Sequence, residues 1–101
     1  MNKLRRKELL EIIKDLNIMK DKDDLYSIIN ELDNIKDEEA DYYNNIPENL
    51  QYSQRAEDSE RAIDNLEEAL NLLNEVYDSD EFDKTNELIQ EAVDKIEDAR
   101  W

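Results

Sequence analysis

The 101-residue sequence contains no cysteine, no histidine and no glycine, and it has a single proline. Without cysteine, the chain has no disulfides, no thiolate metal sites and no cysteine nucleophile. The absence of histidine removes the most common general base and the most common metal ligand. Phosphate-binding loops, dinucleotide fingerprints and EF-hand loops need glycine for their backbone geometry, so the sequence excludes these motifs as well.

The sequence also lacks a long apolar run. Glu8, Glu11 and Lys14 interrupt the apolar residues near the N-terminus, so a signal-peptide core is excluded. No stretch approaches the roughly 20 apolar residues that span a bilayer. We therefore expect a cytoplasmic protein with no membrane partner.

Acidic residues dominate the composition, with 29 Asp and Glu against 13 Lys and Arg and a net charge of −16. Residues 1–22 hold seven basic and four acidic side chains, a balance of +3, whereas residues 23–101 hold 25 acidic and six basic ones, a balance of −19. A chain of this length forms one domain with a modest core. We expect a single acidic helical domain over 1–101, with a basic first helix in 1–22 and a strongly acidic bundle in 23–101. A homodimer that buries more apolar surface is left open.

Apolar residues spaced three and four apart predict an all-α protein with about four helices. We expect a first helix over 3–18. A second helix should begin at a cap on Asp23 or Asp24 and end near Asn44, because Pro47 disfavours helical geometry just beyond that point. Short connections favour an up-and-down helical bundle or a long helical hairpin with flanking helices.

The second half of the chain predicts two more helices. Ser53 is a suitable N-cap for the third, whose first two turns, residues 54–61, have almost no large apolar side chain and are expected to project beyond the core. The fourth helix is expected to start after a cap at Asp78 or Ser79. The residues predicted to face the core are Leu9, Ile12, Ile13, Leu16, Leu25, Ile28, Ile29, Leu32, Ile35, Tyr42, Tyr43, Ala62, Ile63, Leu66, Ala69, Leu70, Leu73, Val76, Tyr77, Phe82, Leu88, Ile89, Val93 and Ile96.

Carboxylates recur at helical spacing over the last two predicted helices. Like charges three or four residues apart lie about 5–6 Å from one another and repel by a few tenths of a kcal/mol per pair. A field of one sign steers oppositely charged surfaces into contact, and its spacing is similar to that of phosphates along a nucleic-acid strand. An alternative of equal weight is that these carboxylates simply form a solvated polar face and contact no partner. The residues that we predict to contact a partner are Glu57, Glu60, Asp64, Glu67, Glu68, Asp83, Glu87, Glu91 and Asp94.

The residues around the proline form a second candidate contact region. Tyr43, Pro47, Tyr52 and Arg55 combine aromatic and arginine side chains, which are enriched at binding hot spots. The alternative is that the tyrosine rings are buried while their hydroxyls reach water or backbone.

The carboxylates do not form a recognisable metal or catalytic motif. Asp78 begins a segment like a calcium loop, but Asp83 replaces the glycine of the sixth position and Ile89 replaces the glutamate of the twelfth. A dimetal site in a helical bundle also needs histidine, which is absent. We therefore expect no cofactor, no metal and no enzymatic activity.

The segment 41–73 resembles a group of known proteins. Its Asn45-Ile46-Pro47-Glu48-Asn49-Leu50-Gln51 run, followed by Ser53, Arg55, Glu57 and the segment 62–69, is similar to small acidic proteins of Firmicutes and their phages, in which an Asn-x-Pro-Glu-Asn-Leu-Gln run precedes an acidic helix. The resemblance implies a phage or mobile-element setting in the cytoplasm of a bacterial host, and it implies no activity. In size, acidity and helicity the chain also looks like DNA-mimic anti-CRISPR and anti-restriction proteins. This second resemblance rests on no shared sequence motif, so it implies no site residues.

These observations support two hypotheses. The first is an inhibitor from a phage or mobile element that blocks the basic nucleic-acid-binding groove of a bacterial defence nuclease or DNA-processing protein, without binding nucleic acid itself. The alternative is a structural or regulatory interaction module, in which apolar stripes and the proline loop contact a partner. In this case the acidic side chains serve only to solvate the protein surface. Salt separates the two, because charge-based complexes weaken steeply with ionic strength.

Overall fold

A computed structural model describes residues 1–100, and over this range the chain forms four α-helices, two short 3-10 helices and no strand. The predicted all-α class with about four helices is confirmed. The helices are α1 (Lys3–Ile18), α2 (Lys22–Asn44), α3 (Gln54–Asp78) and α4 (Asn86–Ala99), with the 3-10 helices η1 (Glu48–Leu50) and η2 (Phe82–Lys84) in the last two connections. None of these helices is both long enough and apolar enough to cross a membrane.

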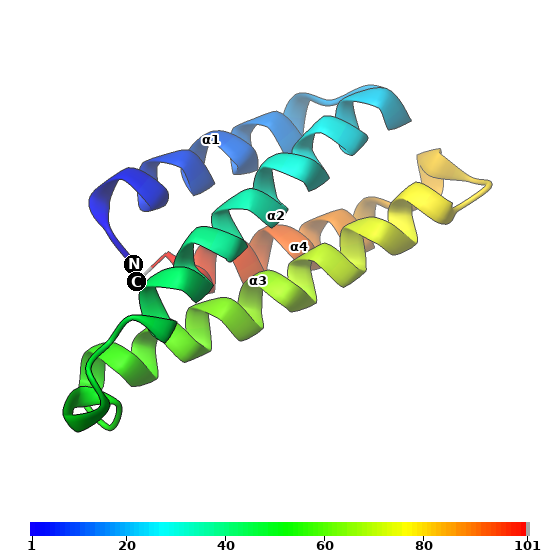
Figure 1. The fold of residues 1–101 in the computed structure, drawn as a ribbon. Coiled ribbons are helices and arrows are strands. Elements are labelled where there is room, and N and C mark those ends of the chain that lie inside the picture. Colours follow the sequence, from blue (N-terminus) through cyan, green and yellow to red (C-terminus); the bar gives the residue numbers. More distant parts are fainter. Residues whose placement is uncertain (101) are drawn as a thin grey trace.

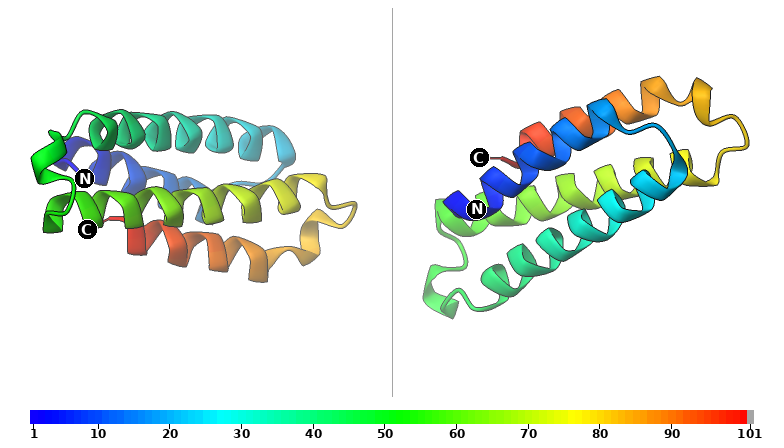
Figure 2. Two further views of the ribbon diagram at one scale, coloured as in Figure 1. Left: turned by 60° about the horizontal axis from the view of Figure 1, so that its bottom comes forward. Right: turned by 90° about the horizontal axis from the view of Figure 1, so that it is seen from above.

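Consecutive helices run antiparallel and form an up-and-down bundle of 48 × 20 × 17 Å (Figure 1). Each helix packs on two neighbours: α1 and α3 both contact α2 and α4. The α1–α2 side of the bundle therefore lies opposite the α3–α4 side (Figure 2). The start of α1 and the end of α4 meet at one end, where Arg100 Nε donates a hydrogen bond to the Arg6 carbonyl at 3.2 Å.

Local capping signals explain most of the helix ends. The predicted bounds of α1, the end of α2 at Asn44 and the Ser53 cap are confirmed, and Ala56 N–H donates to Ser53 Oγ at 3.3 Å. The predicted cap of α2 is wrong by two to three residues, because Asp21 accepts the hydrogen bond from Asp24 N–H at 2.9 Å. Asp23 and Asp24 lie in the first turn instead, where carboxylates interact favourably with the positive end of the helix dipole.

The predicted start of α4 is also wrong. Asp78 is the last residue of α3, and α4 begins at Asn86 after a seven-residue connection. This connection contains η2, whose Phe82 side chain packs against the core. The Thr85 hydroxyl donates to the Phe82 carbonyl at 2.6 Å and stabilises the turn before α4.

The core follows the predicted apolar faces, with most of the predicted residues buried. Tyr77 is 37% exposed at the rim. The predicted core residues that are only partly buried are Ile29, Tyr42, Tyr43, Ile63, Phe82, Leu88 and Ile89. Five buried alanines supply small contact positions on two helices, and they are Ala56, Ala62, Ala69, Ala92 and Ala99 of α3 and α4.

These alanines affect how closely the helices approach one another. Helix separation depends on the side chains at the contact, and small residues permit close approach. Accordingly, the backbones of α3 and α4 lie close together over a longer stretch than those of α1 and α2. Helix α1 contains no alanine and meets its neighbours through leucine and isoleucine side chains.

The first turns of α3 do not project beyond the core as predicted, because Ala56 and Ser59 are buried. The prediction considered large apolar residues only. A small polar residue is accommodated here because it faces a buried carboxylate: Ser59 Oγ donates to Glu39 Oε2 of α2 at 3.0 Å.

Glu39 is fully buried and lies at the centre of a polar cluster between α1, α2 and α3. Its Oε1 is 3.5 Å from the α-amino group of Met1, and its Oε2 is 3.6 Å from Arg5 Nη2. The Arg5 guanidinium also lies 5.7 Å from the centre of the Tyr42 ring. Both ion-pair distances exceed the about 2.7–2.9 Å of a charge-assisted hydrogen bond. Burial lowers the pKa of the Met1 amino group, although the nearby Glu39 carboxylate opposes that effect.

We expect Glu39→Gln to lower the free energy of unfolding by about 3 kcal/mol, because removing one partner of a buried ion pair leaves the other charges uncompensated. Urea denaturation measures the change. Glu38→Gln is the matched control, since Glu38 is exposed and its replacement should change stability by no more than about 0.5 kcal/mol. Equal stability of the two variants would show that the cluster does not stabilise the fold.

Candidate functional site

Acidic side chains form a row along the outer face of α3. Ser59, Ala62 and Leu66 are buried, which orients the opposite side of the helix toward solvent. All of the predicted contact residues on α3 are exposed, and two further exposed acids that the sequence analysis did not include extend the row toward the end of the helix. The α3 row consists of Glu57, Glu60, Asp64, Glu67, Glu68, Glu75 and Asp78.

A second row lies on the outer face of α4. Glu87, Glu91 and Asp94 are exposed as predicted, and Asp98 continues the row. Asp83 is exposed too, but it belongs to η2 and not to the α4 row. Together with Lys20 and Asn86 it lines a hollow of about 380 Å³ between α1 and the start of α4.

Lys95 joins the two rows. Its Nζ lies 2.7 Å from Glu68 Oε2, an ion pair between α4 and α3. The hydrogen bond and the charge of Glu68 raise the pKa of Lys95, and the nearby charges of Asp98 and Glu91 raise it further. Carboxylates of both helices therefore act on one ammonium group, and the rows form one continuous surface, which we call the α3–α4 acidic surface.

Few basic side chains compensate this surface. Within residues 1–100, two acids of α3 form ion pairs: Glu68 pairs with Lys95 of α4, and Asp58 pairs with Arg61 of α3 at 3.7 Å. Surface pairs of this kind contribute at most about 1 kcal/mol each. Other pairs, such as Lys36 with Asp33 at 3.4 Å, lie on different parts of the bundle. Most carboxylates of the α3–α4 acidic surface thus face solvent without a counter-charge.

The candidate patch around the proline is only partly assembled. Pro47 and Arg55 line the same hollow of about 200 Å³, together with Tyr42. Tyr43 is half-buried and does not line this hollow, and the Tyr52 side chain is 93% exposed. The alternative that the tyrosine rings are buried is therefore wrong for Tyr52. A contact role for the four predicted residues stays a prediction.

The basic N-terminal segment is partly directed into the bundle. Arg5 pairs with the buried Glu39, whereas Lys14 pairs with Glu11 of its own helix at 3.6 Å. Lys3 is exposed on the other side of α1. Through Arg5, the segment thus supplies a positive charge to one interior carboxylate.

Over the described residues, no three acidic side chains are arranged to hold a metal ion. Comparison with known proteins adds no further guide, because the chain matches no protein-family model, no curated protein and no solved structure. The resemblance of segment 41–73 to small acidic phage proteins therefore stays a prediction. Charge, exposure and helix geometry are the observations from which a function can be argued.

We expect Glu68→Gln to lower the pKa of Lys95 toward its ordinary value, because the substitution removes the carboxylate whose hydrogen bond and charge contribute most to the shift. An NMR titration of the lysine side-chain resonances measures this pKa. Glu67→Gln removes an equal charge from the neighbouring position and should change the pKa of Lys95 much less. If both variants shift it equally, the ion pair that joins the two rows is absent in solution.

Proposed function

We propose that the α3–α4 acidic surface imitates a nucleic-acid strand and occupies the basic groove of a bacterial defence nuclease or DNA-processing protein. In this proposal the chain is an inhibitor from a phage or mobile element, and it does not bind nucleic acid directly. The observation that carries the proposal is the continuous row of exposed, mostly uncompensated carboxylates on α3, with the second row beside it on α4.

The charge density of the α3 row supports a strand-like surface. Glu57 and Asp78 are separated by about 31 Å at the helical rise of 1.5 Å per residue. The seven acids of the row therefore give one charge per about 4–5 Å, against about 3.4 Å along one nucleic-acid strand and about 1.7 Å along a duplex. The row is close to one strand in charge density and well below a duplex. A groove that binds a single strand fits it best.

The energetics favour association with a basic groove. Neighbouring carboxylates on one helix face repel, at a cost of a few tenths of a kcal/mol per pair. A partner that supplies lysine and arginine side chains relieves this repulsion and releases the counterions held by both surfaces, as nucleic acid does. Residues 23–101 have a charge balance of −19, and the electric field of this charge also raises the rate of association with a positively charged partner.

A second candidate function is the interaction module that contacts its partner through apolar side chains. It is favoured by the exposure of Leu50, the last residue of η1, at 48%, and of Tyr52, two residues further along the chain, at 93%. A complex formed through these side chains would change little with salt concentration, since apolar contacts are not screened.

The proposal predicts that the purified protein captures a nucleic-acid-binding protein from a lysate of a Firmicutes bacterium. We expect the complex to weaken by at least about tenfold between 50 and 200 mM salt and to be displaced by added single-stranded DNA. The triple variant Glu60→Lys, Asp64→Lys and Glu67→Lys should lose the complex while its circular dichroism spectrum and melting temperature stay close to those of the parent.

The matched control reverses three exposed acids of α2 that lie outside the α3–α4 acidic surface: Asp23→Lys, Asp37→Lys and Asp41→Lys. This variant has the same net charge as the first, and it should retain the complex. Equal loss in both variants would indicate a dependence on net charge alone. A salt-resistant partner without a basic groove would reject mimicry and favour the interaction module.

A further inference from the structure

The α1–α2 side of the bundle contains a groove that is distinct from the α3–α4 acidic surface. It consists of two hollows of about 260 and 330 Å³, both lined by residues of α1 and α2, with Met19 of the connection between the helices also lining the smaller one. Glu31 lines both, so the hollows adjoin along the two helices. We call this feature the α1–α2 groove. Its lining residues are Glu8, Glu11, Ile12, Asp15, Ile18, Met19, Asp24, Ser27, Ile28, Glu31, Asn34, Ile35 and Glu38.

The side chains of α1 and α2 explain why a groove forms here. Helix α1 has no alanine, and the two helices meet through Leu and Ile residues, which hold their backbones apart. The alanines of α3 and α4 allow a closer approach on the opposite side of the bundle. The groove is therefore a consequence of the packing and does not depend on a mobile loop.

The groove has an apolar floor. Ile12, Ile28 and Ile35 line it and also belong to the hydrophobic core, so they are held in place from below. Ile18 lines the end of the groove, and its side chain is 72% exposed. Exposure of a large aliphatic side chain beside an apolar floor favours contact with an apolar surface.

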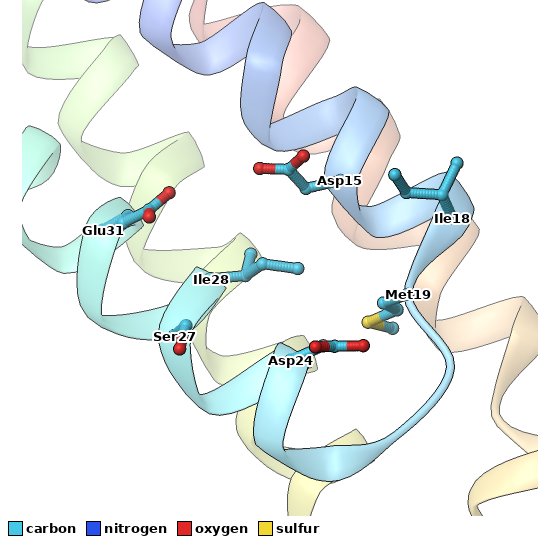
Figure 3. Close-up of a pocket in the computed structure, with 7 residues that line it drawn as sticks. All are labelled: Asp15, Ile18, Met19, Asp24, Ser27, Ile28 and Glu31. Atoms are coloured by element: carbon cyan, nitrogen blue, oxygen red, sulfur yellow. The ribbon is translucent and has the colours of Figure 1, made fainter.

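The walls of the groove are acidic on both sides. Glu8, Glu11 and Asp15 come from α1, and Glu31 and Glu38 come from α2. Figure 3 shows Asp15 and Glu31 extending toward the space between the helices, with Ile28 near them. None of the described residues that line the groove is basic.

We propose that the α1–α2 groove binds a basic amphipathic helix of a partner protein. An apolar stripe at spacings of three and four residues would lie on the isoleucine floor, and lysine or arginine side chains on both flanks would pair with the carboxylates of the two walls. From Glu8 to Ile18 the groove extends for about 15 Å along α1, which accommodates roughly ten residues, or three turns, of a helix.

Charge decides between a basic partner and a second copy of this chain. A second copy could offer Lys3 and Lys7 of its own α1, but it also has a net charge of −16, so two copies repel one another. A basic helix has the opposite charge along its whole length. The groove and the α3–α4 acidic surface lie on opposite sides of the bundle, so this interaction does not depend on the function proposed above.

The probe that tests the groove is a fluorescein-labelled synthetic 14-residue peptide with leucine at helical spacings of three and four and lysine elsewhere. Fluorescence anisotropy measures its dissociation constant. The double variant Asp15→Lys and Glu31→Lys should weaken binding by at least about tenfold, since it removes a carboxylate from each wall and introduces repulsion. The control Asp33→Lys and Asp37→Lys changes the net charge equally on an exposed part of α2 outside the groove and should weaken binding by less than about threefold.

Two further measurements test the apolar part of the groove. Ile18→Ser should weaken binding by about fivefold without loss of stability, because this side chain is already exposed. A peptide of the same composition, with its leucines scattered around the helix, should bind at least about tenfold more weakly. The proposal is wrong if the amphipathic peptide does not bind, if the scattered peptide binds equally well, or if both double variants weaken binding equally. None of these outcomes affects the capture experiment that tests the α3–α4 acidic surface.

Discussion

The buried carboxylate of Glu39 makes the polar contacts that join three of the four helices, α1, α2 and α3. Helix α1 lacks the small residues that bring α3 and α4 together, and it joins the bundle through leucine and isoleucine contacts and through the pairing of Arg5 with Glu39. Ser59 extends the same cluster to α3. Because Arg5 is held inward, the rotation of α1 is set, and this rotation turns Glu8 and Asp15 toward α2. The acidic walls of the α1–α2 groove therefore depend on a polar contact in the interior.

The large negative charge is distributed so that the repulsion stays at the surface. Each acidic row lies opposite a buried face, and water screens carboxylates that face solvent. Glu39, the one buried acidic side chain among residues 1–100, has two positive groups and a hydroxyl beside it. Since the core is modest for a chain of this length, the fold tolerates the remaining repulsion only because the acids are kept out of the helix contacts.

Sequence reasoning predicted the features that depend on local signals. The limits of α1, the end of α2 before Pro47 and the Ser53 cap are set by residues within one turn of each helix end. The exposure of the acidic rows also follows from helical spacing. Glu39 was missed because glutamate is normally a surface residue, although its position four residues after Ile35 places it on the buried stripe of α2. The α1–α2 groove could not be predicted, because it depends on the distance between two helices.

The alanines between α3 and α4 have a consequence for how such a chain can evolve. At Ala62, Ala69 and Ala92 no side-chain surface is exposed, and a larger residue would push the helices apart. Aspartate and glutamate, in contrast, can replace one another along an exposed row without changing its charge. Selection would therefore preserve small residues in the interior while the acidic surface drifts in sequence. Distant descendants would be recognised by the pattern of their alanines and by the buried glutamate sooner than by their acids.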